Sequence, residues 1–189
     1  MKKIIGFFGG SFDPIHFGHI HLALELSEKY QLDEVLFCPA FCSPFKSHFT
    51  PNASPDDRLA MVRLAIEEIP LFKVTSIELD RKGPSFTIDT LKALASEKVQ
   101  FRLLLSEESA AHLDQWKDYH ELILLAPPLI GRRSKEDSPS QGITQMKVLE
   151  ISSTEVRQRL EKGLYCGHLV PAKVLAYIQL HGLYNASNS

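Results

Sequence analysis

The chain has 189 residues, 44% of them hydrophobic and 23% charged, with a formal net charge of -2. This length suits a single domain over residues 1–189, and the hydrophobic fraction predicts a full core rather than a disordered chain. The charge is nearly balanced and Lys and Arg form no run, so we expect no nucleic-acid partner, and the apolar stretches are too short to predict a membrane span.

The first part of the chain alternates short apolar runs with helical patterns. Residues 4–10, IIGFFGG, are typical of a buried parallel strand, and residues 19–30 carry apolar positions at helical spacing. Residues 34–40, EVLFCPA, predict a second strand that Pro39 ends. Residues 41–55 show no periodicity and predict a long loop, which is a common place for function.

The next helix has clear start signals. Ser54 can cap it, Pro55 suits the first helical position, and Asp56 and Asp57 favour the positive end of the helix dipole. Residues 58–69 supply its apolar face. We therefore predict a helix that begins at Pro55.

The alternation continues along the chain. Further strands are predicted at residues 73–79, 99–106, 127–133 and 147–151. Residues 83–98 predict a turn and a helix with Ser85 or Thr87 as its cap, and residues 109–126 have a helical pattern with interruptions.

The C-terminal portion, residues 152–184, is predicted to be mostly helical. Ser152 and Glu155 have the spacing of a capping box, Gly163 is a helix stop, and a final helix is predicted over residues 171–182. Five or six strands alternating with helices predict an α/β fold with a doubly wound, mostly parallel sheet in a single domain. Such folds bind ligands beyond the carboxyl ends of the strands, usually at the end of the first strand.

The cysteines indicate a reducing compartment. There are three, an odd and low count that argues against a disulfide framework and predicts a cytoplasmic protein. The N-terminal segment MKKIIGFFGG is too short, and ends too soon in glycine, for a signal peptide. Cys38 and Cys42 are four residues apart, but no second Cys or His pair with ligand spacing lies near them, so we predict no metal site.

The segment GGSFDPIHFGH, residues 9–19, stands where the predicted first strand ends. Gly9 and Gly10 allow the backbone to approach a ligand, because no Cβ intervenes. Asp13-Pro14 predicts a turn that leads into a helix, whose first N–H groups and positive dipole end form an anion site.

Two imidazoles belong to the same segment. His16 and His19 are three residues apart, so on a first helical turn they would share a face, with Gly18 leaving space between them. The result is a concave surface with two imidazoles and several N–H donors, which suits a polyphosphate chain. The sequence contains neither GxGxxG nor GxxxxGK[ST], and a histidine pair without a third ligand is a weak indication of a metal.

The stretch GSFDPIHFGH, residues 10–19, resembles the HxGH signature of the nucleotidylyltransferase superfamily, whose fold is Rossmann-like. In that superfamily the two histidines contact ATP phosphates and stabilise the charge that develops as a nucleotide is transferred and pyrophosphate leaves. The resemblance implies catalytic roles for His16 and His19. It also implies ATP contacts from Gly9, Gly10, Ser11, Phe12 and Gly18.

A second stretch, ISSTEVR at residues 151–157, resembles the ISSTxxR motif of the same superfamily. It combines hydroxyls at a capped helix start with Arg157 one turn later, and arginine suits forked contacts with phosphate oxygens. Alone, an ordinary capping box with a surface arginine would explain this pattern equally well. With the first motif, the resemblance implies a catalytic Arg157 and ATP contacts from Ile151, Ser152, Ser153 and Thr154.

Nearly the whole chain resembles bacterial nicotinate-nucleotide adenylyltransferases. The matching stretches are residues 33–40, 44–46, 83–91, 131–133 and 182–184 (GLY), together with Trp116. Trp116 falls where that family has an aromatic residue that stacks on the pyridine ring, and its polar neighbours favour a partly exposed ring. The resemblance implies transfer of AMP from ATP to nicotinate mononucleotide, which gives nicotinate adenine dinucleotide and pyrophosphate in NAD biosynthesis.

The same resemblance implies further site residues and a cofactor. Lys46 would join the catalytic residues and Arg133 the ATP contacts, while Thr87, Glu108 and Trp116 would bind the mononucleotide. Mg²⁺ is expected with ATP, held mainly by phosphates and water. The expected partners are these small-molecule substrates, and a homo-oligomer stays open.

Several positions depart from the family pattern, mostly on the mononucleotide side. Residues 40–43, Ala-Phe-Cys-Ser, replace a stretch with an asparagine, and Phe45 replaces a histidine. Residues 106–108 replace a GxD sequence, and Lys117 replaces a tyrosine. Two alternatives therefore remain: an adenylyl- or cytidylyltransferase with another phosphate acceptor, or a nucleotide-binding protein with a degenerate acceptor site. The choice between acid and amide mononucleotide is also open.

Overall fold

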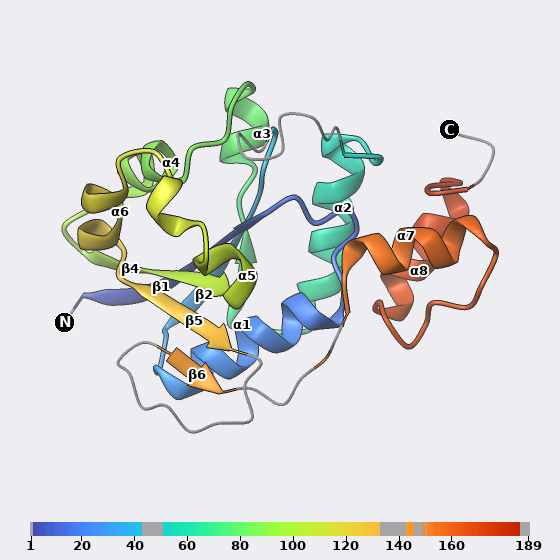
Figure 1. Cartoon of the computed structure of the whole chain (residues 1–189), viewed down its shortest axis with the longest axis horizontal. Helices are drawn as coiled ribbons and strands as arrows, with labels where there is room; N and C mark the ends of the chain where they lie inside the picture. The colour runs from blue at the N-terminus through green and yellow to red at the C-terminus, as the bar shows by residue number, and fades with distance from the viewer. Residues whose placement is uncertain (1, 43–50, 133–142, 146–148, 150, 186–189) are drawn as a thin grey trace.

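The computed structural model describes residues 2–42, 51–132, 143–145, 149 and 151–185. Within these residues, six parallel strands form one sheet in the order β3-β2-β1-β4-β5-β6 (Figure 1). They are β1 (Lys3–Gly10), β2 (Glu34–Pro39), β3 (Phe72–Val74), β4 (Val99–Ser106), β5 (Pro128–Arg132) and β6 (Ile143–Gln145). The order reverses beside β1, so the predicted doubly wound parallel sheet is confirmed.

Helices cover both faces of this sheet. They are α1 (Phe17–Lys29), α2 (Pro55–Ile66), α3 (Ile77–Arg81), α4 (Thr87–Leu94), α5 (Glu107–Ala110), α6 (Tyr119–Leu125), α7 (Ser153–Glu161) and α8 (Ala172–Leu180), with a 3-10 turn, η2 (Leu113–Gln115). One hydrophobic cluster contains Leu26 of α1, Val62 of α2 and Ile178 of α8. A second contains Leu91 of α4 and Leu122 of α6. Among the described helices, none is both long enough and apolar enough to cross a membrane.

The central position of β1 follows from its apolar run. Phe8 belongs to the first cluster and Phe7 to the second, because successive side chains of a strand point to opposite faces. β1 therefore ends, at Gly9 and Gly10, in the middle of the sheet edge and next to the reversal of strand order.

The C-terminal helices α7 and α8 lie beside α2 and the start of α1 (Figure 1). Phe17 N, at the start of α1, donates to Leu169 O in the segment between α7 and α8, at 2.9 Å. Tyr177 of α8 donates its hydroxyl to Asp57 Oδ1 of α2, at 2.9 Å. The last part of the chain thus packs against elements from its first third.

Two predicted strands are wrong in their bounds. The strand predicted over residues 73–79 ends at Val74, and α3 begins at Ile77. Here Thr75 Oγ1 accepts a hydrogen bond from Ile77 N at 3.3 Å, a side-chain bond to the backbone that competes with strand pairing. The sixth described strand, β6, lies at residues 143–145. Of the strand predicted over residues 147–151, residues 147, 148 and 150 lie outside the described part of the chain, and Leu149 and Ile151 are not in a strand; Ile151 N donates to Leu149 O at 2.9 Å.

Two predicted helices also differ in detail. Neither Ser85 nor Thr87 caps α4, whose N-cap is Phe86; Ser85 Oγ instead accepts from Phe41 N at 2.9 Å. The pattern at residues 109–126 is divided, because Asp118 has a left-handed backbone with φ 51° and α6 begins only after it.

The start signals of α2 and α7 are confirmed. Ser54 Oγ accepts from Asp57 N, and Ser152 Oγ accepts from Glu155 N, each at 3.1 Å. Of the predicted 41–55 loop, residues 43–50 lie outside the described part of the chain.

Candidate active site

The glycine corner at the end of β1 is crowded by the protein itself. A Cβ on Gly10 would lie 3.1 Å from the Phe12 ring, and one on Gly9 would lie 3.3 Å from the Phe7 ring. Phe12 has φ 48° and is 2% exposed, and its side chain belongs to the first hydrophobic cluster. Gly9, Gly10 and Ser11 all line a cavity beside the corner.

The two imidazoles are stacked on each other at the start of α1. The ring centres of His16 and His19 are 3.7 Å apart with an interplanar angle of 27°. His16 is the N-cap of α1, and its backbone N donates to His19 Nδ1 at 3.3 Å. Because Nδ1 accepts, the proton of a neutral His19 ring is on Nε2, a donor suited to a phosphate oxygen. The ring centres of Phe8 and Phe12 lie 6.0 and 5.1 Å from the ring centre of His19, and this packing fixes the orientation of the imidazole.

The prediction that Gly18 leaves an empty space between the two histidine side chains is wrong. A Cβ at this position would lie 3.0 Å from His16 Nδ1 and 3.4 Å from the carbonyl oxygen of Ile151. The glycine therefore makes room for the His16 ring and for the second motif, and not for a gap between the two histidines.

The two motifs are in direct contact although they are far apart in the sequence. Ser153 Oγ donates to Pro14 O at 3.0 Å, and Arg157 Nη1 donates to Asp13 O at 2.7 Å, across 139 and 144 residues. Arg157 Nη2 donates to Thr154 Oγ1 at 3.2 Å. The guanidinium is thereby held against the loop that joins the glycine corner to the histidines.

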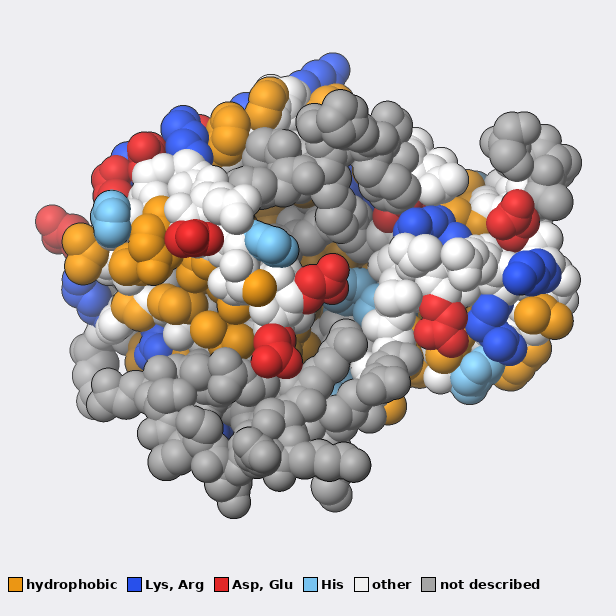
Figure 2. Space-filling view, viewed as in Figure 1, with side chains coloured by type: hydrophobic (Ala, Val, Ile, Leu, Met, Phe, Trp, Pro, Cys, Tyr) orange, Lys and Arg blue, Asp and Glu red, His pale blue; other side chains and the backbone are white. Residues whose placement is uncertain are grey.

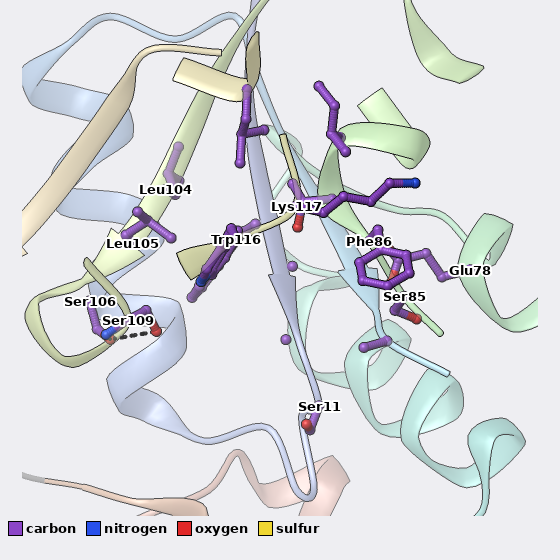
Figure 3. A pocket seen from close by; sticks show the side chains of 17 residues that line it. Ser11, Glu78, Ser85, Phe86, Leu104, Leu105, Ser106, Ser109, Trp116 and Lys117 are labelled. Carbon is purple, nitrogen blue, oxygen red and sulfur yellow. Dashed lines mark hydrogen bonds between the residues drawn. The ribbon is translucent and has the colours of Figure 1, made fainter. Parts of the chain in front are cut away.

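The cavity beside the corner has an empty volume of about 840 Å³, including its open mouth. Trp116 and Phe86 lie on different sides of it, and Ser11 lies at the end nearest the glycine corner (Figure 3). Thr87, the first residue of α4, also lines it. Trp116 is half-buried, which agrees with the predicted partly exposed ring.

Glu108, the third predicted mononucleotide-binding residue, does not line the cavity as Thr87 and Trp116 do. Glu108 is exposed in α5 and is not among the cavity-lining residues, whereas Ser106 and Ser109 are. Lys117 lines the cavity, binds both carboxylate oxygens of Asp89 at 2.8 and 2.9 Å, and places Nζ 4.9 Å from the Phe86 ring centre. Two other predicted residues, Lys46 and Arg133, lie outside the described residues.

Two buried charged residues at the site were not found from the sequence. Glu78, 3% exposed, lines the cavity and accepts from Thr90 Oγ1 at 2.7 Å. Arg58, 1% exposed, donates from Nη1 to Ser11 O and Ala40 O at 2.8 and 2.7 Å, and so joins the ends of β1 and β2. The sequence contains one indication of this role. Arg58 falls within the apolar stripe of a predicted helix, where a charged residue is unusual unless it is paired.

The CxxxC pair does not form a site. Cys38 is buried in the second cluster, where burial, with the nearby Glu78 charge, raises the pKa of its thiol well above the usual range. Cys42 is exposed. The described residues contain no group of three His, Cys, Asp or Glu that could hold a metal ion.

Figure 2 shows the molecule from the same side as Figure 1, with a histidine side chain visible in the furrow between the sheet part and the C-terminal helices. Since α1 begins with the histidine pair and α7 carries Arg157, this furrow and the adjoining cavity make up the candidate site.

In comparisons with known proteins, the family model, the relatives and the solved structure that match this chain are all named as nucleotidylyltransferases. The model of the cytidylyltransferase-like family matches residues 7–159. A protein of Dehalococcoides mccartyi named probable nicotinate-nucleotide adenylyltransferase is 39% identical, over 95% of this chain and 96% of the relative. One of the same name from Pseudomonas fluorescens is 36% identical over the full length of both chains. A structure of Plasmodium falciparum nicotinic acid mononucleotide adenylyltransferase complexed with NaAD has a TM-score of 0.78 at 21% identity, over 96% of this chain and 97% of that chain.

Proposed function

Because the chain belongs to the nicotinate-nucleotide adenylyltransferase family, we propose that it transfers AMP from ATP to nicotinate mononucleotide. The products are nicotinate adenine dinucleotide and pyrophosphate, a step of NAD biosynthesis. The observation that carries the proposal is the contact of the two motifs, in which Ser153 and Arg157 bind the carbonyls of Pro14 and Asp13. This contact places a guanidinium and two imidazoles around one glycine corner.

The reaction needs no protein nucleophile. A phosphate oxygen of the mononucleotide attacks the α-phosphorus of ATP, and the bond from that phosphorus to the bridging oxygen breaks, with its electron pair leaving on pyrophosphate. The protein therefore contributes positioning and charge stabilisation. His16 and His19 would hold ATP phosphates, with His19 nearer the developing charge, and Arg157 would neutralise the departing pyrophosphate. The roles given to Lys46 and Arg133 rest on the sequence resemblance alone.

The cavity supplies a place for the acceptor. Trp116 offers a flat, partly exposed ring for a pyridine, and Thr87 presents its hydroxyl and N–H groups at the start of α4 for a carboxylate. The Plasmodium falciparum enzyme of similar fold was solved in complex with NaAD, which supports a pyridine dinucleotide as the product here.

Mg²⁺ would accompany ATP. The buried carboxylate nearest the corner, Asp13, is engaged by protein donors, so the chemistry of the donor set fits an ion held by the triphosphate and water. When bound, the ion neutralises phosphate charge.

Three wider properties are part of the proposal. Motifs from both ends of the chain build one site, which supports residues 1–189 as a single nucleotidylyltransferase domain. The three cysteines are free thiols, which supports a cytoplasmic location. A homo-oligomer is compatible with the site, which is built within one chain.

A second candidate is transfer to a different phosphate acceptor. Lys117, paired with Asp89 at the cavity, is the observation that favours it, because this pair changes the charge and shape of the acceptor side.

One assay separates these functions. The protein is incubated with ATP and Mg²⁺ and with nicotinate mononucleotide, nicotinamide mononucleotide or another phosphate acceptor, and pyrophosphate release is measured. We expect the highest kcat/KM with nicotinate mononucleotide. Release with only another acceptor would support the second candidate, and ATP binding without release from any acceptor would contradict both.

A further inference from the structure

A buried carboxylate connects the first motif to the C-terminus. Asp13 is 1% exposed, and its Oδ1 accepts from Ala53 N at 3.0 Å and from the Tyr184 hydroxyl at 2.8 Å. Its Oδ2 accepts from Asn52 N at 2.9 Å. Arg157 Nη1 lies 3.8 Å from Oδ2 and donates to the Asp13 carbonyl instead. Four segments of the chain therefore meet at one side chain.

Tyr184 belongs to the GLY stretch that ends the family resemblance and that the proposed reaction does not use. Its backbone has φ 61°, two residues after Gly182 at φ 59°. A left-handed backbone is unfavourable for a tyrosine and persists only where tertiary contacts impose it. Burial, and next the charge of Asp13, raise the pKa of the phenol, so the hydroxyl stays protonated and acts as a donor.

The hydroxyl affects how Asp13 and Arg157 interact. With Oδ1 and Oδ2 engaged by three donors, the carboxylate is compensated without a short bond to the guanidinium. The guanidinium of Arg157 is instead anchored by Nη1 on the Asp13 carbonyl and by Nη2 on Thr154 Oγ1. If the phenol oxygen is removed, Asp13 loses one donor, and the guanidinium at 3.8 Å is the nearest charged group that can replace it.

We propose that Tyr184 is a positioning residue for Arg157: through Asp13, its hydroxyl keeps the guanidinium in the orientation that binds the phosphates of ATP. The proposal rests on the proposed use of Arg157 in adenylyl transfer.

The chain offers a matched control on the same C-terminal portion. Tyr177 of α8 also donates its hydroxyl to a carboxylate, Asp57 Oδ1, at 2.9 Å. That bond joins α8 to α2 and does not involve the first motif. Tyr177→Phe therefore removes the same chemical group from the same part of the fold, away from Arg157.

The test is a double-mutant cycle on ATP binding. Tyr184→Phe and Tyr177→Phe are made in the full chain, each with and without Arg157→Ala, and the Kd for ATP is measured by calorimetry beside kcat and the KM values. We expect Tyr184→Phe to weaken ATP binding about 3- to 10-fold while Tyr177→Phe stays within about twofold. In the Arg157→Ala background, the effect of Tyr184→Phe should fall to less than about twofold.

Several outcomes would overturn the proposal. These are equal effects of the two Phe variants, an undiminished effect of Tyr184→Phe beside Arg157→Ala, or a Tyr184→Phe chain that does not fold. A change in the KM for the mononucleotide alone would also contradict it. Because the cycle is measured on ATP binding, it decides the role of Tyr184 even if nicotinate mononucleotide proves not to be the acceptor.

Discussion

At the scale of single residues, the side chains around the glycine corner and the histidine pair hold one another in place. The His16 and His19 rings stack, Phe12 packs against the edge of His19, and Gly18 leaves room for His16. The donors are therefore oriented before any ligand binds, which is what charge stabilisation in a transition state requires.

His19→Ala should lower turnover at least about tenfold, because in the proposed mechanism it removes the donor nearest the developing charge. His19 is only partly buried, so the thermal unfolding midpoint should change little. His168→Ala, at an exposed imidazole outside the motifs, is the control and should leave turnover unchanged. Pyrophosphate release measures both, and full activity of His19→Ala would remove His19 from the mechanism.

Gly18→Ala tests the packing of the corner. Alanine is the better helix former by about 0.5–1 kcal/mol, but its Cβ would lie 3.0 Å from His16 Nδ1 and should displace that ring. We expect kcat to fall at least about tenfold, since small displacements of positioning groups are costly in catalysis. Steady-state kinetics and thermal unfolding, measured together, check this. Wild-type kcat would show that the exact place of the His16 ring does not matter.

At the scale of elements, the helices α1, α4 and α7 each begin at the candidate site. α1 starts at the histidine pair, α4 starts at Thr87 on the cavity, and α7 starts at the second motif. Their N–H groups and dipoles favour the anionic groups of both substrates. The caps of these helices therefore affect function as well as stability.

Ser152→Ala and Ser54→Ala form a pair that separates the two effects. Each removes an N-cap hydrogen bond of 3.1 Å and should cost about 1 kcal/mol of folding free energy. Only Ser152→Ala should also raise the KM for ATP, because α7 carries Arg157. Denaturant unfolding and ATP kinetics measure the two quantities. An equal change in the KM for ATP in both variants would contradict this role of α7.

The sequence correctly predicted the elements that have strong local signals. Its predictions were less accurate where contacts between distant parts of the chain determine the local structure. The buried run of β1 and the caps of α2 and α7 are local features, and the structure agrees with them. Within the predicted strand at residues 147–151, Leu149 and Ile151 are as apolar as strand residues, but the structure places neither in a strand, and Ile151 N donates to Leu149 O instead. Apolar content alone does not distinguish these cases.

The same limit applies to the site. The motif residues were found by resemblance, but the partners of Asp13 were not, because Tyr184 lies 171 residues away and no local pattern reports such a contact. Arg58 was missed as a site residue for a similar reason, since its bonds to Ser11 and Ala40 appear only after β1 and β2 are paired.

At the scale of the whole molecule, the two ends of the chain close on one site. The first motif follows β1 in the middle of the sheet, and α7 contacts it through Ser153 and Arg157, while α8 lies beside α2 (Figure 1). Two guanidiniums, Arg58 and Arg157, lie near the buried carboxylate of Asp13, which favours polyanions at this point. The arrangement predicts that bound ATP bridges the two ends.

The most direct measurement of this claim is a crystal structure of the chain with Mg²⁺ and a non-hydrolysable ATP analogue. The account predicts phosphate oxygens within hydrogen-bond distance of His19 Nε2 and of the Arg157 guanidinium, beside the backbone of residues 9–11. A triphosphate bound elsewhere, or one that contacts the first motif while Arg157 stays turned away from it, would contradict the account.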